Sequence, residues 1–239
     1  MRLHFTLSRN QQSVPFDYQH WLTGVFHKWL KNNNLHDKIS LYSLSWLDGS
    51  FARNGSLSFP RGVKWFVSFY EDDYAERLVN GALADPEMFC GMRVLEIRQQ
   101  STPDLGTRYR FKVASPVFVK GKPTTDGTPP HHYLYNEPEA DALMTATLIH
   151  KMDEANKNAV EIRFTDEDKR VRVKFDREFP NPKSKKVNIT KKVKGETIVI
   201  EHKASICPVI IEGTTKAVRF AWNVGVGNGT GSCFGSLKE

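Results

Sequence analysis

Apolar residues follow two periodicities along this chain, and the order in which these alternate constrains the fold more than any other feature. Residues 2–7 alternate between apolar and polar side chains, as a strand with one buried face does. Residues 17–30 instead carry apolar side chains at helical spacing. Further strand-like stretches cover residues 39–47, 56–59, 63–69, 91–99 and 107–119, and a second helical pattern covers residues 74–83. The first half is therefore predicted to run βαββαβ with one added strand.

A stretch rich in Pro, Gly and Thr at residues 120–130 predicts a boundary in the middle of the chain. Beyond it, helical spacing covers residues 137–155 and 214–222, and strand-like patterns cover residues 160–164, 171–175, 197–202 and 206–211. The second half again mixes strands with two helices. We expect an α+β protein with tandem ferredoxin-like (RRM-like) domains at residues 1–119 and 120–239, because both halves show this order of elements.

The charge, the cysteine spacing and the apolar runs of the chain limit the kinds of partner, metal site and membrane association that it can have. The 34 Lys and Arg residues exceed the 27 Asp and Glu residues, and the formal charge of +7 favours a polyanionic partner without requiring one. The cysteines Cys90, Cys207 and Cys233 have the spacing of neither a zinc site nor a disulfide framework, so we expect reduced thiols in a cytoplasmic protein. No run of about 18 apolar residues occurs, which argues against a membrane span.

The C-terminal tail is dense in glycine. Residues 225–235 contain five glycines, Gly225, Gly227, Gly229, Gly231 and Gly235. Glycine allows positive φ and close approach, so such a loop can offer backbone N–H groups to phosphate oxygens. The stretch lacks the Gly-Lys-Ser/Thr of a Walker loop and the GxGxxG order of dinucleotide folds. A phosphate-binding loop and a plain structural loop both remain open on glycine content.

A basic run lies between Lys183 and Lys194, with six lysines, no acidic residue and strand-like residues between them. Lys185, Lys186, Lys191 and Lys192 are the candidates for phosphate contacts in a β-hairpin that grips RNA. The alternative is a solvated sheet edge protected by its charge. The single sign of the run favours RNA.

Two histidines fall on one stripe of the first predicted helix. His20 and His27 are seven residues apart and share this stripe with Gly24 and Lys31, opposite the apolar face. The stripe faces either RNA or water. His131 and His132 form another pair, but no carboxylate or cysteine has metal-ligand spacing to them, so we interpret them as a loop pair and expect no metal or other cofactor.

Several segments of the chain resemble one family. The C-terminal pattern GxGxxxxxxFG is similar to the glycine-rich loop of the CRISPR-associated repeat-RNA-processing endoribonucleases. MRLHFTL, Tyr18-Gln19-His20, Leu35-His36-Asp37 and Leu41-Tyr42-Ser43-Leu44 follow the order and spacing of that family's N-terminus, and residues 133–151 resemble the opening of its second domain. Cys233 stands where the family usually has glycine, and Gly229 and Gly231 replace bulkier residues, so a basic side chain of the loop is missing.

The resemblance implies a metal-independent endoribonuclease that cuts CRISPR repeat RNA. The ribose 2′-OH beside the scissile bond attacks the phosphate and leaves a 2′,3′-cyclic phosphate and a 5′-OH. Such chemistry needs a base, an acid and positive charge near the phosphate. By family position, His36 is the expected catalytic histidine, His27 its partner and Lys38 the cation. The helix stripe adds His20 and Lys31 as expected RNA contacts, and the basic run and the glycine loop add the four hairpin lysines and the five glycines.

Two other functions stay open on the sequence alone. A catalytically silent member would hold repeat RNA within a CRISPR effector complex. For either function we expect a monomer or homodimer, with CRISPR effector subunits as candidate further partners. A general single-strand RNA-binding protein would carry aromatic side chains on its sheets, but the RRM signature is missing from every strand that the pattern predicts.

Overall fold

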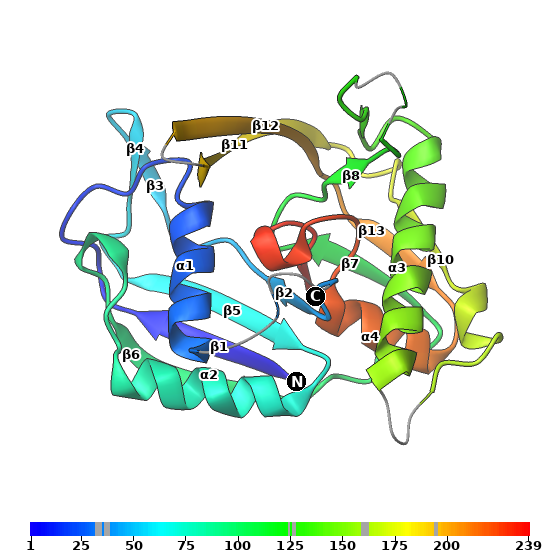
Figure 1. Ribbon diagram of the computed structural model, residues 1–239, viewed down its shortest axis with the longest axis horizontal. Helices are drawn as coiled ribbons and strands as arrows, with labels where there is room; N and C mark the ends of the chain where they lie inside the picture. Colours follow the sequence, from blue (N-terminus) through cyan, green and yellow to red (C-terminus); the bar gives the residue numbers. More distant parts are fainter. Residues whose placement is uncertain (32–34, 36–38, 124, 126–127, 159–162, 194–195) are drawn as a thin grey trace.

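The computed structural model describes residues 1–31, 35, 39–123, 125, 128–158, 163–193 and 196–239. Its first half forms a four-stranded antiparallel sheet in the order β2-β5-β1-β6, and two helices lie along it (Figure 1). The elements are β1 (Arg2–Leu7), α1 (Gln19–Leu30), β2 (Tyr42–Leu44), β5 (Val63–Phe69), α2 (Asp72–Ala84) and β6 (Val94–Gln100), with a small hairpin of β3 (Phe51–Arg53) and β4 (Ser56–Ser58) and a short turn of helix, η2 (Phe89–Gly91).

The second half repeats this arrangement with the sheet order β10-β13-β7-β14. Its main elements are β7 (Arg108–Val113), α3 (Glu139–Asn158), β10 (Arg172–Phe175), β13 (Val209–Glu212), α4 (Thr215–Val224) and β14 (Leu237–Lys238). The additions are β8 (Val119–Lys120), β9 (His132–Tyr133), η3 (Asp168–Arg170), β11 (Lys183–Val193), β12 (Glu196–Ile206) and η4 (Thr230–Ser232). Two βαββαβ units in tandem confirm the predicted α+β, ferredoxin-like fold.

The added strand of the first half turns out to open the second unit. β7 pairs with β13 and β14, so the sheets change between β6 and β7, before the division expected at residue 120. The segment at residues 120–130 instead connects β8 to β9. Local alternation identifies a strand but does not tell which sheet it joins, and this explains the difference. The strand predicted at 160–164 falls largely outside the described residues.

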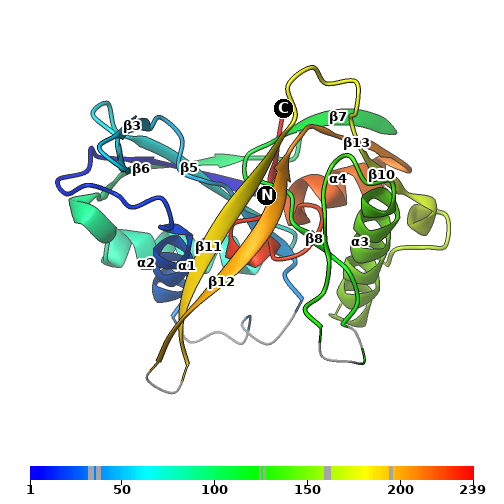
Figure 2. The same cartoon turned by 90° about the horizontal axis from the view of Figure 1, so that it is seen from above.

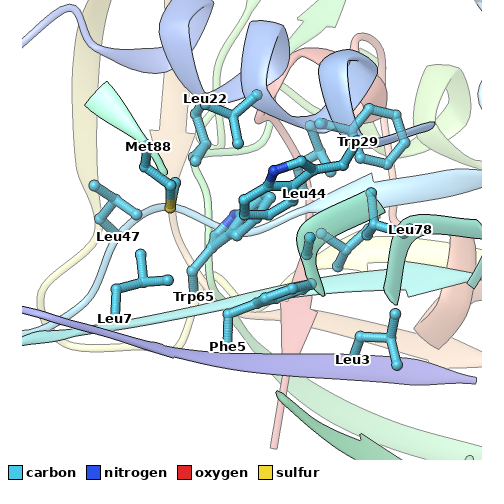
Figure 3. Close-up of a cluster of buried hydrophobic side chains, with 14 of the residues drawn as sticks. Leu3, Phe5, Leu7, Leu22, Trp29, Leu44, Leu47, Trp65, Leu78 and Met88 are labelled. Atoms are coloured by element: carbon cyan, nitrogen blue, oxygen red, sulfur yellow. The ribbon is translucent and has the colours of Figure 1, made fainter. Parts of the chain in front are cut away.

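The core of the first unit follows directly from the two periodicities. On β1, Leu3, Phe5 and Leu7 alternate toward the helices and are at most 2% exposed. On α1, Leu22 and Trp29 lie two turns apart on the face that meets them (Figure 3). The rings of Phe5 and Trp29 stack with centroids 5.5 Å apart. Burial of such large side chains contributes about 1.5–3 kcal/mol each, so this contact fixes α1 on the sheet.

A buried arginine joins the two units. Arg2 on β1 is 2% exposed, and its guanidinium lies 3.4 Å from the ring centroid of Trp222 on α4. It donates hydrogen bonds to Ser68 Oγ in the first unit and to the carbonyls of Trp222 and Leu237 in the second. Burial lowers the pKa of Arg2 to about 9. Cation–π contact and three acceptors offset that desolvation.

The longest strands form an arm outside both sheets. β11 and β12 pair over eleven residues each, and the hairpin runs from the second unit across the molecule toward α1 (Figure 2). β11 contacts α1, which belongs to the first unit. Across the described ranges, none of the helices has the length and apolar character needed to span a bilayer.

Candidate RNA-binding and cleavage site

The stripe predicted on α1 is present in the structure. His20 lies in the first turn, with Nδ1 2.8 Å from the carbonyl of Asp17, and His27 lies two turns further along, half-buried with its ring edge-on to Phe26. Seven residues correspond to about 10.5 Å along a helix axis, so these two imidazoles do not exchange a proton directly. Lys31 follows the helix, is exposed and has a φ of 53°. Gly24 is exposed between the two histidines.

The catalytic turn predicted by the resemblance, with His36 and Lys38, lies outside the described residues. Its described neighbours Leu35 and Ile39 line a cavity of about 460 Å³ between the two units. Glu71, Asp72, Asp73 and Glu154 also line this cavity. Carboxylates repel a phosphate, so this cavity does not suit a phosphate group.

The C-terminal glycine loop lies against the histidine-bearing helix. Cys233 Sγ is 3.8 Å from Thr23 Oγ1 and 3.8 Å from the carbonyl of Gln19, both on α1. Trp46 Nε1 donates a 2.8 Å hydrogen bond to the carbonyl of Cys233. These contacts pack Cys233, near the C-terminus, against α1 and Trp46 of the first unit.

Most glycines of this loop are packed inside the protein. Gly225, Gly227, Gly231 and Gly235 are buried, whereas Gly229 is exposed. A Cβ on Gly235 would lie 1.9 Å from the carbonyl oxygen of Val226, and one on Gly227 would lie 2.5 Å from that of Phe118. The N–H groups of Gly225, Val226, Asn228 and Gly235 donate to protein carbonyls. These glycines therefore have a packing role, and the loop's RNA contact stays a prediction that now centres on Gly229 and its exposed neighbour Ser232.

Cys233 occupies a backbone conformation that glycine favours. Its φ is 65° and ψ 37°, in the left-handed region that costs a residue with a side chain about 1–2 kcal/mol. The preference for glycine at this position in the family therefore has a local reason. Burial raises the pKa of the Cys233 thiol to about 12 and keeps it protonated.

A buried lysine beneath the loop was not predicted. Lys151 on α3 is 2% exposed, and its Nζ donates 2.8 Å hydrogen bonds to the carbonyl of Val224 and to Thr230 Oγ1. Thr230 in turn donates to the carbonyl of Tyr42 in the first unit. Burial lowers the pKa of Lys151 to about 7. The sequence carried a signal, because Met144, Leu148, Lys151 and Ala155 share one helical stripe.

The basic run forms the hairpin arm, and its lysines alternate between two faces. Lys185 Nζ lies 4.7 Å from the ring centroid of Trp46, on the face that carries the buried Val187 and Ile189. Partial burial lowers the pKa of Lys185. Lys186 points to the opposite face and forms a 3.2 Å ion pair with Glu201. Lys191 and Lys192 pair in register with Ile198 and Thr197, and their side chains lie outside the described part.

An apolar cluster fixes the base of this arm on the glycine loop. Val187, Ile189 and Ala204 of the hairpin are buried against Phe118 and Phe234. Phe234 belongs to the loop, so hairpin, loop and α1 are packed as one assembly. Among the groups of this assembly that reach the surface are His20 and His27 of α1, Gly229 of the loop and Lys186 of β11. Over the residues that are described, no group of three or more His, Cys, Asp or Glu side chains is placed to hold a metal ion.

Comparisons with known proteins agree with this architecture. The family model described as CRISPR associated protein Cas6, C-terminal, matches residues 98–239. No curated protein sequence matches the chain. The product of a Cas6-related gene from Pyrococcus furiosus superimposes with a TM-score of 0.81 at 15% identity, covering 100% of this chain and 97% of that one.

Two further solved structures are similar. One described as CRISPR associated protein Cas6 has a TM-score of 0.72 at 18% identity, and a RAMP protein binding different RNA substrates has 0.74 at 17%. Each match covers 100% of this chain and 98% of the other. At these identities the likeness establishes the fold alone. Because the family model spans more than half of the sequence, the chain belongs to the Cas6 family of CRISPR-associated proteins.

Proposed function

We propose that this protein is a metal-independent endoribonuclease that cuts CRISPR repeat RNA by attack of the ribose 2′-OH. The observation that carries the proposal is the packing of the histidine-bearing helix α1 against the C-terminal glycine loop in a chain of the Cas6 family. Two structures with the same fold support RNA as the ligand, since one is described as binding different RNA substrates and another as a Cas6 product complex.

The proposed reaction needs two proton transfers. A base removes the proton of the 2′-OH, the 2′-oxygen bonds to phosphorus, and the bond to the 5′-oxygen breaks as an acid protonates that oxygen. We assign these roles to His36 and His27, because imidazole titrates near neutrality. Lys38 supplies positive charge to the phosphate in the transition state. The products are a 2′,3′-cyclic phosphate and a 5′-OH.

The RNA path follows the basic and exposed groups around this helix. His20 and Lys31 mark the two ends of α1, Gly229 marks the edge of the loop, and Lys186 marks the outer face of the arm. Phosphates contacted along this path hold the scissile bond beside His27 and the turn that contains His36. Subunits of a CRISPR effector complex are proposed as further partners.

One cleavage assay tests the proposal. Purified protein is incubated with repeat RNA in EDTA, beside the same RNA carrying 2′-deoxyribose before the cut. We expect full cleavage in EDTA and none of the deoxy substrate, which should still bind, because the ribose supplies the nucleophile. Mapping the product ends should give a cyclic phosphate.

Three results would contradict the proposal in different ways. Activity lost in EDTA and restored by Mg²⁺ would indicate a metal-dependent mechanism. A deoxy substrate that is cut would identify water as the nucleophile. Tight binding without any cleavage would assign the chain to the catalytically silent members that only hold repeat RNA.

A further inference from the structure

Two histidines outside the proposed catalytic helix lie together at the base of the hairpin arm. His132 on β9 and His202 on β12 have parallel rings, with an interplanar angle of 2° and centroids 6.0 Å apart. Both are half-buried, so part of each ring reaches the surface. The two residues are 70 positions apart in sequence and meet because β9 lies beside β12.

Two buried phenylalanines, Phe118 and Phe234, support the imidazole rings. Phe118 is 5% exposed and meets the two imidazoles edge-on, with centroids 4.9 Å from His132 and 4.7 Å from His202. Phe234 of the glycine loop, 1% exposed, lies 5.4 Å from His202 and 5.3 Å from Phe118. Because buried rings already hold the two imidazoles in place, these side chains lose little conformational entropy when they bind a ligand.

A backbone contact fixes the tautomer of neutral His132. The N–H of Lys203 donates to Nδ1 of His132 at 3.3 Å, so a neutral His132 carries its proton on Nε2. Burial, together with the positive charges of Lys203, His131 and Lys120, lowers the pKa of His132, although Glu201 acts in the opposite sense. His132 is therefore a neutral ring at neutral pH, suited to stacking.

The surroundings suit a nucleic acid strand. Lys120 and Lys203 are exposed beside the pair. Asn228, next to the exposed Gly229, links the loop to β8 by donating to the carbonyl of Phe118 and accepting from the N–H of Lys120. Aromatic rings beside lysines form the usual surface for unpaired bases, with stacking for the base and cations for the phosphate.

We propose that His132 and His202, supported by Phe118 and Phe234, form a stacking platform for one unpaired nucleobase of the bound RNA. The platform rests on the proposed function, because it takes RNA as the ligand. It adds a binding subsite on the side of the glycine loop that faces the hairpin. A base held there keeps the strand in register with the exposed loop edge.

Binding assays with an uncleavable single-stranded RNA test this platform. The probe is a short 2′-deoxy-substituted repeat RNA carrying 2-aminopurine at successive positions, and affinity is measured at several salt concentrations. His132→Ala with His202→Ala should weaken binding about 5- to 150-fold and remove the quenching of one 2-aminopurine. The log–log salt slope should not change, because a ring that stacks on a base displaces no counterion from a phosphate.

Matched variants separate stacking from a general disturbance of the fold. His132→Phe keeps a flat ring and should retain both quenching and affinity, and His150→Ala removes an exposed histidine from α3 and should have no effect. If the double variant unfolds, His132→Gln gives the same test with a smaller change. Wild-type affinity and quenching in a folded His-pair variant, or a salt slope reduced by a full ionic contact, would overturn the platform. Cleavage of native repeat RNA is scored separately, so either proposal can fail while the other stands.

Discussion

At the scale of single residues, Lys151 shows how burial converts an ordinary lysine into a titrating group. Its two acceptors, the carbonyl of Val224 and Thr230 Oγ1, are neutral oxygens and match the two N–H groups of an uncharged amine. Burial is the cause that lowers its pKa to about 7, from 10.5 in an unfolded chain. Between these two values the unfolded state binds one more proton than the folded state.

The free energy of unfolding should therefore rise with pH above neutrality. The slope is at most about 1.4 kcal/mol per pH unit, so wild type should gain up to about 2 kcal/mol between about pH 7 and about pH 8.5. Urea unfolding measures this gain, and Lys151→Met should lack it, while Lys157→Met at an exposed position of α3 should keep it. The same rise in Lys151→Met would mean that other groups cause it.

The catalytic assignment is also tested at single residues. His36→Ala should lower the single-turnover cleavage rate at least about a hundredfold, because general acid–base groups contribute about 10²- to 10⁴-fold to the rate. RNA affinity should change little, since one neutral imidazole adds little to an interface with many phosphates. His27→Ala should lose a similar amount or less, and the double variant less than the product if the two act as a pair. Cleavage at the wild-type rate by His36→Ala would contradict this assignment and move the catalytic role to His27.

At the scale of elements, the hairpin β11–β12 explains why a basic run does not make a basic face. Successive strand residues point to opposite sides, so Lys185 lies over Trp46 while Lys186 faces away and pairs with Glu201. The inner face also carries Val187 and Ile189, which attach the arm to the glycine loop. The arm is thus packed on one side and charged on the other.

Neutralising the lysines of the arm should weaken RNA binding, because fewer RNA phosphates then meet a positive charge. Changing Lys185, Lys186, Lys191 and Lys192 to Gln should reduce the log–log salt slope by about 0.7 to 0.9 for each phosphate that is no longer neutralised by a lysine. Of the two described side chains, Lys186→Gln should reduce it more than Lys185→Gln, because Lys185 is partly buried over Trp46. Lys174→Gln on β10 serves as the control. An unchanged salt slope in the quadruple variant would mean that the arm is a solvated sheet edge that does not contact phosphates.

At the scale of the whole molecule, Arg2 couples the two ferredoxin-like units. It connects β1 to Trp222 and to Leu237 near the C-terminus, so its contacts join opposite ends of the chain. Lys151, Thr230 and Tyr42 form a second connection between the units. Because both links are buried, the units are expected to unfold in one transition.

Removing the arginine should weaken this coupling. Arg2→Ala should lower the free energy of unfolding by about 2–4 kcal/mol, because it deletes charged hydrogen bonds and leaves buried carbonyls unpaired. Arg2→Lys should restore little, since an ammonium does not reproduce the planar stacking on Trp222. Denaturant unfolding followed by tryptophan fluorescence and circular dichroism measures this, with Arg9→Ala at an exposed position as control. A decrease of less than about 0.5 kcal/mol in the free energy of unfolding of Arg2→Ala would contradict this prediction.

The sequence by itself determined the elements and the family. Strand and helix periodicities are local properties, so β1, α1, β5, α3 and α4 lie where their patterns predicted them, and the motifs at both ends indicated the CRISPR-associated family. These signals need only a few consecutive residues, because side chains repeat every two residues in a strand and about every 3.6 in a helix.

Only the tertiary structure decided which distant residues meet. It placed β7 in the second sheet, buried four of the five loop glycines, put Lys151 beneath that loop and brought His132 to His202 across 70 positions. Strand pairing, burial and pKa depend on neighbours that are remote in sequence, and the pattern of a segment carries no record of them. The sequence therefore does not distinguish a buried lysine with a lowered pKa from a solvated one, because the difference comes from the residues packed around it.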